Sequence, residues 1–183
     1  MERQKILVFG AAGNLGMYFL DHLLNNLDMD KYEIIATGTR NKYPYKFYEG
    51  NYIQVDISKE EEFDKLPKSN VYAVIDFAGV LPAYLENDDP HKYVNINVNG
   101  TLNILEYCKK VKVDRIIYTQ TWAELNGYLK EKKPLKPMAP RKPIHTGDHA
   151  IYTVTKTAAV ELIECYHQMY GLKNFIFKLP NIY

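Results

Sequence analysis

The stretch GAAGNLG, residues 10–16, decides the fold that this sequence predicts. It follows a short run of strand-forming residues, KILVF at 5–9, and it precedes a series of apolar residues. These apolar residues recur at helical spacing: Leu15, Phe19, Leu23 and Leu27. A strand, a glycine turn and a helix are therefore expected to follow one another at the start of the chain.

The three glycines of this turn each have a physical use. Gly10 permits the tight turn, Gly13 lets the backbone approach a diphosphate, and Gly16 lets the helix pack closely on the strand. The N–H groups of Asn14 and Leu15 add donors at the positive end of the helix dipole. The G-x-x-G-x-x-G spacing differs from the commoner G-x-G-x-x-G pattern. The prediction of a dinucleotide site therefore rests on the position of the turn between strand and helix.

Strand and helix patterns alternate along the rest of the chain. Further strands are expected at 32–38, 52–56, 71–79, 115–121 and 174–180, and helices at 61–66, 91–110 and 153–170. This order predicts an α/β fold, a doubly wound parallel sheet (Rossmann fold) with helices on both faces and any ligand beyond the carboxyl ends of the strands. No repeat or second domain boundary is visible, so residues 1–183 are expected to form one NAD(P)-binding domain.

Composition and charge narrow the range of functions. Hydrophobic residues make up 46% of the chain, charged residues make up 25%, and the formal net charge is +1, as in an ordinary globular domain. A charge so close to zero gives no reason to expect nucleic acid or a membrane surface as a partner, which leaves small molecules. The sequence shows neither a signal-peptide pattern nor a long apolar run, so we expect a cytoplasmic protein.

The two cysteines, Cys108 and Cys165, each lie in an apolar helical pattern. We expect both to be reduced thiols in the core, because this setting is typical of neither a disulfide framework nor a zinc site. No metal site is predicted.

One segment interrupts the alternation. Residues 127–149 are rich in lysine and proline, and so many prolines exclude both a helix and a central strand. The segment is expected to be a long loop beside the predicted crevice. Two interpretations stay open, a solvated basic insertion and a cover for an anionic substrate.

Two Tyr-x-x-x-Lys pairs compete for the role of a catalytic pair, Tyr128 with Lys132 and Tyr152 with Lys156. Only the second opens an expected helix, in which residues four apart share a face, so Tyr152 is the candidate. A phenol has a pKa near ~10 and is a poor base at neutral pH, but a nearby ammonium and an oxidised nicotinamide both favour the phenolate. Lys156 is therefore expected to tune Tyr152.

A third group should hold the substrate hydroxyl during catalysis. The strand expected at 115–121 ends in YTQT, which places Thr119 and Thr121 at the carboxyl edge of the sheet. Either threonine is a candidate from position alone.

Several short motifs occur in an order that covers the whole chain. They are the glycine turn, VDIS with Asp56, DFAG after the fourth strand, NVNGT from Asn97, YTQT, YTVTK and the closing KLPNIY. With these motifs the chain resembles the extended branch of the short-chain dehydrogenase/reductase superfamily. Within that branch it resembles the NAD(P)-dependent epimerase/dehydratase family, which acts on nucleotide sugars.

The resemblance implies a set of cofactor contacts. It implies a pyrophosphate loop at Gly10, Gly13 and Gly16, an adenine contact at Asp56 and Ile57, and a turn against the cofactor at Ala78 and Gly79. Pro180 with Asn181 resembles the segment beside the nicotinamide and the substrate.

The resemblance also implies the catalytic roles. Tyr152 matches the acid/base, and Lys156 matches the partner that also holds the nicotinamide ribose. Thr121 matches the hydroxyl-bearing residue, and Asn97 matches the helix asparagine of the catalytic relay. Two alternatives stay open beside these roles, because Asn97 is also compatible with a satisfied core amide and Thr121 with an ordinary strand hydroxyl.

The sequence departs from the family in two places. Members usually continue beyond the point matched by Tyr183 into a smaller C-terminal region that shapes the sugar pocket, so we expect the chain to be truncated. Dehydratases typically follow the catalytic threonine with Asp-Glu, whereas Thr121 is followed by Trp122 and Ala123. Glu124 would replace that pair only if the backbone bulged, so elimination of water is not expected.

These observations favour an NAD(P)-dependent epimerase that acts on a nucleotide sugar through transient oxidation. The alternatives are an NADP-dependent reductase of sugars or other ketones and a non-catalytic NAD(P)-sensing domain. The identity of the sugar stays undetermined, and a homodimer stays open as the assembly.

The end of the second strand predicts the cofactor. NAD-binding proteins of this fold carry an acidic residue there, which binds the ribose hydroxyls and repels a 2′-phosphate. This strand ends in ATGTRNK, with Thr37 at the acidic position and Thr39, Arg40 and Lys42 behind it. A guanidinium can hold a phosphate through paired hydrogen bonds, so NADP is predicted in preference to NAD. The alternative is that Arg40 is simply solvated and that the site accepts either cofactor.

Overall fold

Six parallel strands form the centre of the fold in a computed structural model that describes residues 2–82, 89–131, 133–136 and 139–180. The strands are β1 (Gln4–Phe9), β2 (Tyr32–Gly38), β3 (Asn51–Gln54), β4 (Val71–Asp76), β5 (Arg115–Thr121) and β6 (Lys173–Leu179). Their order is β3-β2-β1-β4-β5-β6, and every neighbouring pair is parallel. The predicted doubly wound parallel sheet is confirmed.

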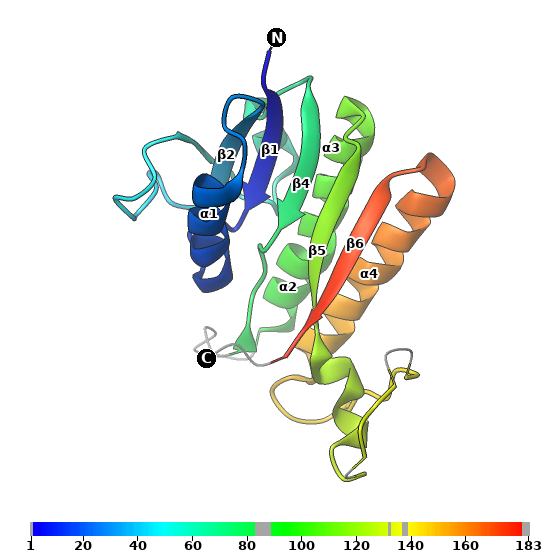
Figure 1. The fold of residues 1–183 in the computed structure, drawn as a ribbon. Coiled ribbons are helices and arrows are strands. Elements are labelled where there is room, and N and C mark those ends of the chain that lie inside the picture. The colour runs from blue at the N-terminus through cyan, green and yellow to red at the C-terminus, as the bar shows by residue number, and fades with distance from the viewer. Residues whose placement is uncertain (1, 83–88, 132, 137–138, 181–183) are drawn as a thin grey trace.

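Helices flank this sheet on both sides. They are α1 (Asn14–Asn26), α3 (Thr101–Val111) and α4 (Ala150–Tyr170), with the shorter segments η1 (Glu60–Lys65), α2 (Pro90–Tyr93), η3 (Val94–Gly100) and η4 (Trp122–Tyr128). Figure 1 shows α1 on one face of the sheet and α3 and α4 on the other. The helix expected at 91–110 consists of α2, η3 and α3 in succession, and η3 is a π-helical turn of the kind frequent at functional sites.

The core has two parts, one on each face of the sheet. On one face Val8 of β1 belongs to the same buried cluster as Leu20 of α1. On the other face Phe9 belongs to the cluster that contains Ile104 of α3 and Ile163 of α4. Successive residues of β1 are thus buried on opposite faces, which explains why a parallel central strand reads as a continuous apolar run.

The strand β6 departs from the expectation of helices on both faces. Its residues Phe175 and Phe177 are 47% and 53% exposed. They share one face of the strand, because alternate residues of a strand point to the same side. In Figure 1, among the described residues, no helix lies over β6 on the side of α1. The second helical layer therefore covers only part of the sheet.

The expectation that both cysteines are buried is wrong for Cys165. Cys108 of α3 is buried, whereas Cys165 of α4 is exposed. The reason is that α4 turns only one face toward the sheet, and Cys165 lies on the opposite face.

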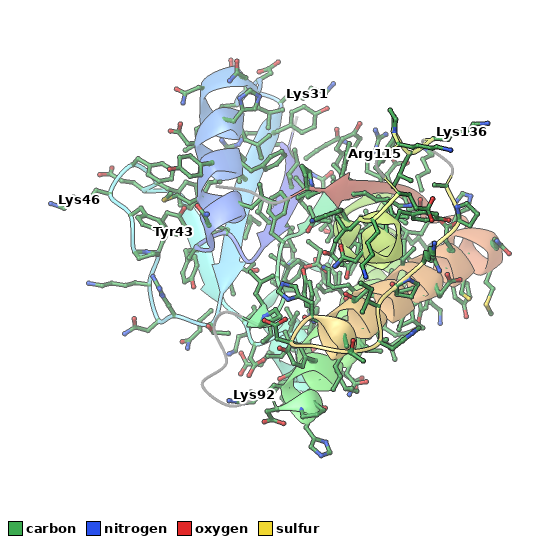
Figure 2. The ribbon with its side chains drawn as sticks, turned by 90° about the horizontal axis from the view of Figure 1, so that it is seen from below. Lys31, Tyr43, Lys46, Lys92, Arg115 and Lys136 are labelled. Carbon is green, nitrogen blue, oxygen red and sulfur yellow. The ribbon has the colours of Figure 1, made fainter. Side chains whose placement is uncertain are left out.

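The lysine- and proline-rich segment begins slightly later than predicted, because η4 includes Gly127 and Tyr128. Two backbone hydrogen bonds tie the segment to η4. The N–H of Lys142 donates to the carbonyl of Glu124, and the N–H of Gly127 donates to the carbonyl of Lys142, both at 2.8 Å. Figure 1 shows the segment beyond the carboxyl ends of β5 and β6. In Figure 2, Lys136 of this segment lies across the molecule from the loop between β2 and β3, which carries Tyr43 and Lys46.

Two absences hold for the described part of the chain. No helix there combines the length and the apolar character that crossing a membrane requires. No group of three or more His, Cys, Asp or Glu side chains there is placed to hold a metal ion.

Candidate active site

The glycine turn follows a backbone path that requires two of its glycines. Gly10 has a φ of +69°, and a Cβ there would lie 2.7 Å from the backbone nitrogen of Ala78. A Cβ on Gly16 would lie 2.3 Å from the carbonyl oxygen of Gly10. Gly13 is different, because its φ is −75° and a Cβ there would meet only the Gly10 oxygen, at 3.2 Å. Gly10 and Gly16 thus serve the turn and its packing, and Gly13 leaves space open above the turn.

The N-terminus of α1 suits an anionic ligand. Its N-cap residue, Gly13, makes no side-chain hydrogen bond to the helix, and the first turn contains no acidic residue. The first N–H groups of a helix lack intrahelical partners and carry a partial positive charge. The turn therefore fits the diphosphate of a dinucleotide, for which Gly13 would leave room.

A cavity of about 650 Å³ extends from the glycine turn to the ends of β5 and β6 and the start of α4. It brings together predicted residues from both halves of the chain. Those that line it are Gly10, Gly13, Asn14, Leu15, Gly16, Ala78, Gly79, Thr119, Thr121, Tyr152, Lys156 and Pro180. Asn181 lies outside the described residues. Predicted phosphate-binding and catalytic residues therefore share one cavity.

Tyr152 lies in the first turn of α4, next to the end of β5. The side chain of Thr121 lies close to the phenol of Tyr152 and accepts a hydrogen bond from the N–H of Ala123 at 3.2 Å. Burial raises the pKa of Tyr152, and the hydroxyl of Thr121 opposes that rise. The hydroxyl and the phenol thus lie together as predicted, but Lys156 is not among the groups that shift the pKa of Tyr152.

The ammonium of Lys156 has a different aromatic neighbour. Its Nζ lies 3.9 Å from the centroid of the Tyr118 ring, a cation–π contact. Burial lowers the pKa of Lys156 to about 8, and the negative charge of Asp76 opposes this decrease. Asp76 ends β4 and was not predicted as a site residue. The sequence feature that could have identified Asp76 is a carboxylate at the end of an otherwise apolar strand.

Asn97 lies behind the cavity wall rather than in it. Its Oδ1 accepts a hydrogen bond from the N–H of Val80 at 2.9 Å, and its Nδ2 donates to Oγ1 of Thr155 at 3.2 Å. The side chain therefore links the loop after β4 to α4, in the π-helical turn. Its amide is satisfied, which agrees with the core-amide interpretation, and a catalytic role for Asn97 stays a prediction.

The residues assigned to the adenosine half do not line this cavity. They are Thr39, Arg40, Asp56 and Ile57. Asp56 uses Oδ1 to accept hydrogen bonds from the N–H and the hydroxyl of Ser58, at 3.1 and 2.7 Å. Ile57 is buried, and its carbonyl accepts a bond from Asn103. Their contact with adenine stays a prediction.

Thr37 does not occupy the position that the sequence suggested. It is fully buried within β2, and its hydroxyl donates to the carbonyl of Val8 at 3.3 Å. Thr39 and Arg40 are the exposed residues after β2. Their carbonyls accept hydrogen bonds from Gln54 and Tyr52 respectively, which fixes the backbone of this turn.

The loop before α4 contributes residues that sequence reasoning missed. Ile144, Thr146, Asp148 and His149 all line the cavity. The ring of His149 meets the ring of Tyr152 edge-on, with centroids 6.2 Å apart, and its Nδ1 lies 2.8 Å from Asp148 Oδ1. The lysine- and proline-rich segment thus forms one wall of the site at its carboxyl end. The sequence feature that could have indicated this role is the position of the segment between β5 and α4.

The competing tyrosine, Tyr128, is directed elsewhere. It ends η4 and does not line the cavity, and its ring lies 4.7 Å from the ammonium of Lys142. Lys132 lies outside the described residues. The geometry therefore favours Tyr152, whose lysine lines the same cavity four residues further along α4.

Glu124 is buried and holds the loop in place. Its Oε2 lies 3.2 Å from Nε of Arg141, and its Oε1 lies 2.8 Å from Nζ of Lys178 in β6. Arg141 also pairs with Glu161 of α4. The carboxylate of Glu124 therefore joins the loop, η4 and β6, and it does not line the cavity. The bulge that would turn it toward a substrate is not present.

The sequence profile of the NAD dependent epimerase/dehydratase family matches residues 6–183. The chain belongs to the NAD-dependent epimerase/dehydratase family. One similar member, from Methanocaldococcus jannaschii, is named a putative UDP-glucose 4-epimerase. It is 29% identical over 184 aligned residues, which cover 97% of this chain and 56% of that protein.

Solved structures of the epimerase/dehydratase type share the fold. The UDP-glucose 4-epimerase of Thermotoga maritima, solved with UDP-glucose, has a TM-score of 0.82 and 22% identity, over 98% of this chain and 56% of its own. The UDP-glucose 4-epimerase of Thermus thermophilus, solved with NAD, has a TM-score of 0.78 and 22% identity, over 96% and 54%. The chain therefore spans about half the length of the relatives it matches.

Proposed function

We propose that this member of the epimerase/dehydratase family is an NAD(P)-dependent epimerase of a nucleotide sugar, with residues 1–183 as its cofactor-binding domain. The observation that carries the proposal is the continuous cavity that joins the uncapped N-terminus of α1 to Tyr152 and Lys156. The names of the similar proteins supply the substrate class, since UDP-glucose 4-epimerases recur among them.

Each part of the cavity has a task in this reaction. A bound nicotinamide would accept a hydride from the sugar and later return it. Tyr152 takes the proton of the reacting hydroxyl as the sugar is oxidised and gives it back on reduction. Thr121 hydrogen-bonds the same hydroxyl and holds it beside the phenol. Lys156 lines the same cavity and would hold the nicotinamide ribose, the role that its position in the family motif implies.

The proposal is tested by supplying the complete gene product with UDP-glucose and other nucleotide sugars, with NAD or NADP. We expect an epimer of one of these sugars, detected by chromatography and assigned by proton NMR. Consumption of a sugar with stoichiometric reduction of added cofactor would instead identify a simple dehydrogenase. Tight cofactor binding with no conversion of any sugar would support a cofactor-sensing domain.

We predict that no dehydrated sugar forms in the same incubations. The two positions after Thr121 are Trp122 and Ala123, and the next residue along the chain, Glu124, is held by Arg141 and Lys178. Elimination needs an acid and a base at the sugar, and these positions supply neither. Mass spectrometry should show no 4-keto-6-deoxy product. A product lighter by one water molecule would contradict the prediction.

We further propose that NADP binds more tightly than NAD. Arg40 is exposed on a turn whose backbone is fixed, and within the described residues no carboxylate pairs with its guanidinium. Such a guanidinium is free to bind a 2′-phosphate. We expect at least roughly tenfold tighter binding of NADP, about 1.4 kcal/mol, measured by calorimetry on residues 1–183.

The variant Arg40→Ala should remove most of that margin. Lys46→Ala is the matched control, because Lys46 is an exposed cation of the loop between β2 and β3 (Figure 2) and has no assigned contact with the cofactor. Equal affinities for the two dinucleotides, or equal losses in both variants, would refute this assignment.

A further inference from the structure

A buried carboxylate directly precedes two residues that line the cavity, Phe77 and Ala78, where neither dinucleotide binding nor the tyrosine pair calls for one. Asp76 is 0% exposed at the end of β4. Its Oδ1 accepts a hydrogen bond from the N–H of Ala78 at 2.9 Å. Its Oδ2 is buried and has no hydrogen-bond partner among the described residues. A buried ionisable group with an unused oxygen is costly, so its presence requires an explanation.

The explanation is the ammonium of Lys156, which is itself 5% exposed and lies against Tyr118, the residue that pairs with Asp76 between β4 and β5. Within the described part of the chain its Nζ donates no hydrogen bond, and it lies 3.9 Å from the centroid of the Tyr118 ring. A cation–π contact gives only about 0.5–2 kcal/mol, less than the cost of burying an unpaired ammonium. Lys156 therefore needs a further source of negative potential to stay charged.

The other titratable groups around the pair do not supply that potential. Tyr118 from β5 and Cys108 from α3 lie close enough to Asp76 for its charge to act on them, and Tyr152 from α4 acts in turn on Tyr118. Burial raises the pKa of all three, and the charge of Asp76 raises the pKa of Tyr118 and Cys108 further, so all three are neutral at pH 7. Among these described neighbours Asp76 is the one anion and Lys156 the one cation.

The effects on the pair itself are mutual. Burial raises the pKa of Asp76 to about 6 and lowers that of Lys156 to about 8, and each charge opposes the shift of the other. The two groups are therefore both charged between about pH 6 and 8, the interval in which each supports the other.

We infer that Asp76 is a positioning residue that keeps Lys156 in its ammonium form at the floor of the cavity. Asp76 acts through the low-dielectric interior and touches neither the cofactor nor the substrate. Its consequence for catalysis rests on the proposed function, because there Lys156 holds the nicotinamide ribose as a hydrogen-bond-donating ammonium. The effect of Asp76 on the protonation of Lys156 does not depend on any reaction.

The variant Asp76→Asn isolates the charge. The amide oxygen of asparagine can still accept the N–H of Ala78, and the side chain has nearly the same volume. In residues 1–183 labelled with ¹³C-lysine, NMR should follow the side-chain carbon of Lys156 against pH, assigned with Lys156→Arg. We expect a midpoint near pH 8 in the original chain and at least one unit lower in Asp76→Asn. Asp114→Asn, which removes a carboxylate at the opposite end of β5, should leave the midpoint unchanged.

Unchanged titration of Lys156 in Asp76→Asn would overturn the inference. If this variant fails to fold, the NMR titration of the original chain still tests the inference. Ionisation of Asp76 must then appear as a second inflection of the Lys156 signal near pH 6. Absence of that inflection would also overturn it. In the complete gene product, Asp76→Asn should lower the apparent pKa of the alkaline limb of the kcat/KM–pH profile by the same amount, at least one unit. A shifted NMR midpoint in a protein without activity would support the role of Asp76 and refute the proposed function. Epimerase activity with an unchanged midpoint would support the proposed function and refute the role of Asp76.

Discussion

Turnover falls by at least about 100-fold when Tyr152 is replaced by phenylalanine in the complete gene product, if the phenol is the acid/base of this site. The substitution removes one oxygen and leaves the ring, which packs among Tyr93 and His149. The free energy of unfolding should therefore change little. Steady-state kinetics with the epimerised sugar, and calorimetry with the dinucleotide, separate loss of chemistry from loss of binding.

Tyr128→Phe is the matched control. It removes the same atom from the other Tyr-x-x-x-Lys pair, whose tyrosine lies against Lys142 outside the cavity. Turnover of this variant should stay within about twofold of the original. Comparable losses in the two variants would show that the choice between the pairs is mistaken.

Gly16→Ala is expected to give a large loss of stability. Its Cβ would lie 2.3 Å from the carbonyl oxygen of Gly10 and 2.8 Å from Cα of Ala11, and both are backbone atoms that cannot rotate away. Overpacking of this kind costs about 3 kcal/mol or more, because β1 and α1 must separate. Denaturant unfolding of residues 1–183 would show it as a lower midpoint with an unchanged slope.

Gly13→Ala makes the same chemical change three residues earlier with a different outcome. Its φ is ordinary for alanine, and the nearest contact of the added methyl is 3.2 Å, so stability should fall by no more than about 1 kcal/mol. The methyl would instead stand where the diphosphate is proposed to bind. Calorimetry should therefore show at least about tenfold weaker dinucleotide binding. Equal destabilisation by the two alanines would contradict the separate roles assigned to these glycines.

The sequence by itself determined the parallel α/β fold, because that fold is encoded in short windows. Apolar spacing around GAAGNLG identifies a strand, a turn and a helix within the first 27 residues, and the same periodicities recur in each later unit. The candidate pair Tyr152 and Lys156 was also accessible from sequence, since residues four apart share a helix face wherever the helix lies.

Tertiary structure decided which groups face the cavity and which charges are buried together. Thr37 and Arg40 lie three residues apart, yet one is sealed in the sheet and the other is exposed. From sequence, Glu124 would serve catalysis only if the backbone bulged, and in the structure Arg141 and Lys178 hold it away from the cavity. Neither outcome follows from spacing, because each depends on what distant segments place opposite the side chain.

The pair Asp76 and Lys156 shows the same limit most clearly. The two residues are far apart in sequence and come near each other only because both lie beside Tyr118, Asp76 as its partner in the sheet and Lys156 over its ring. Periodicity reports which face of an element is apolar, and it is a local property of the backbone geometry. The protonation state of a buried group is set by desolvation and by every charge nearby, whatever its position in the chain, so only the folded structure determines it.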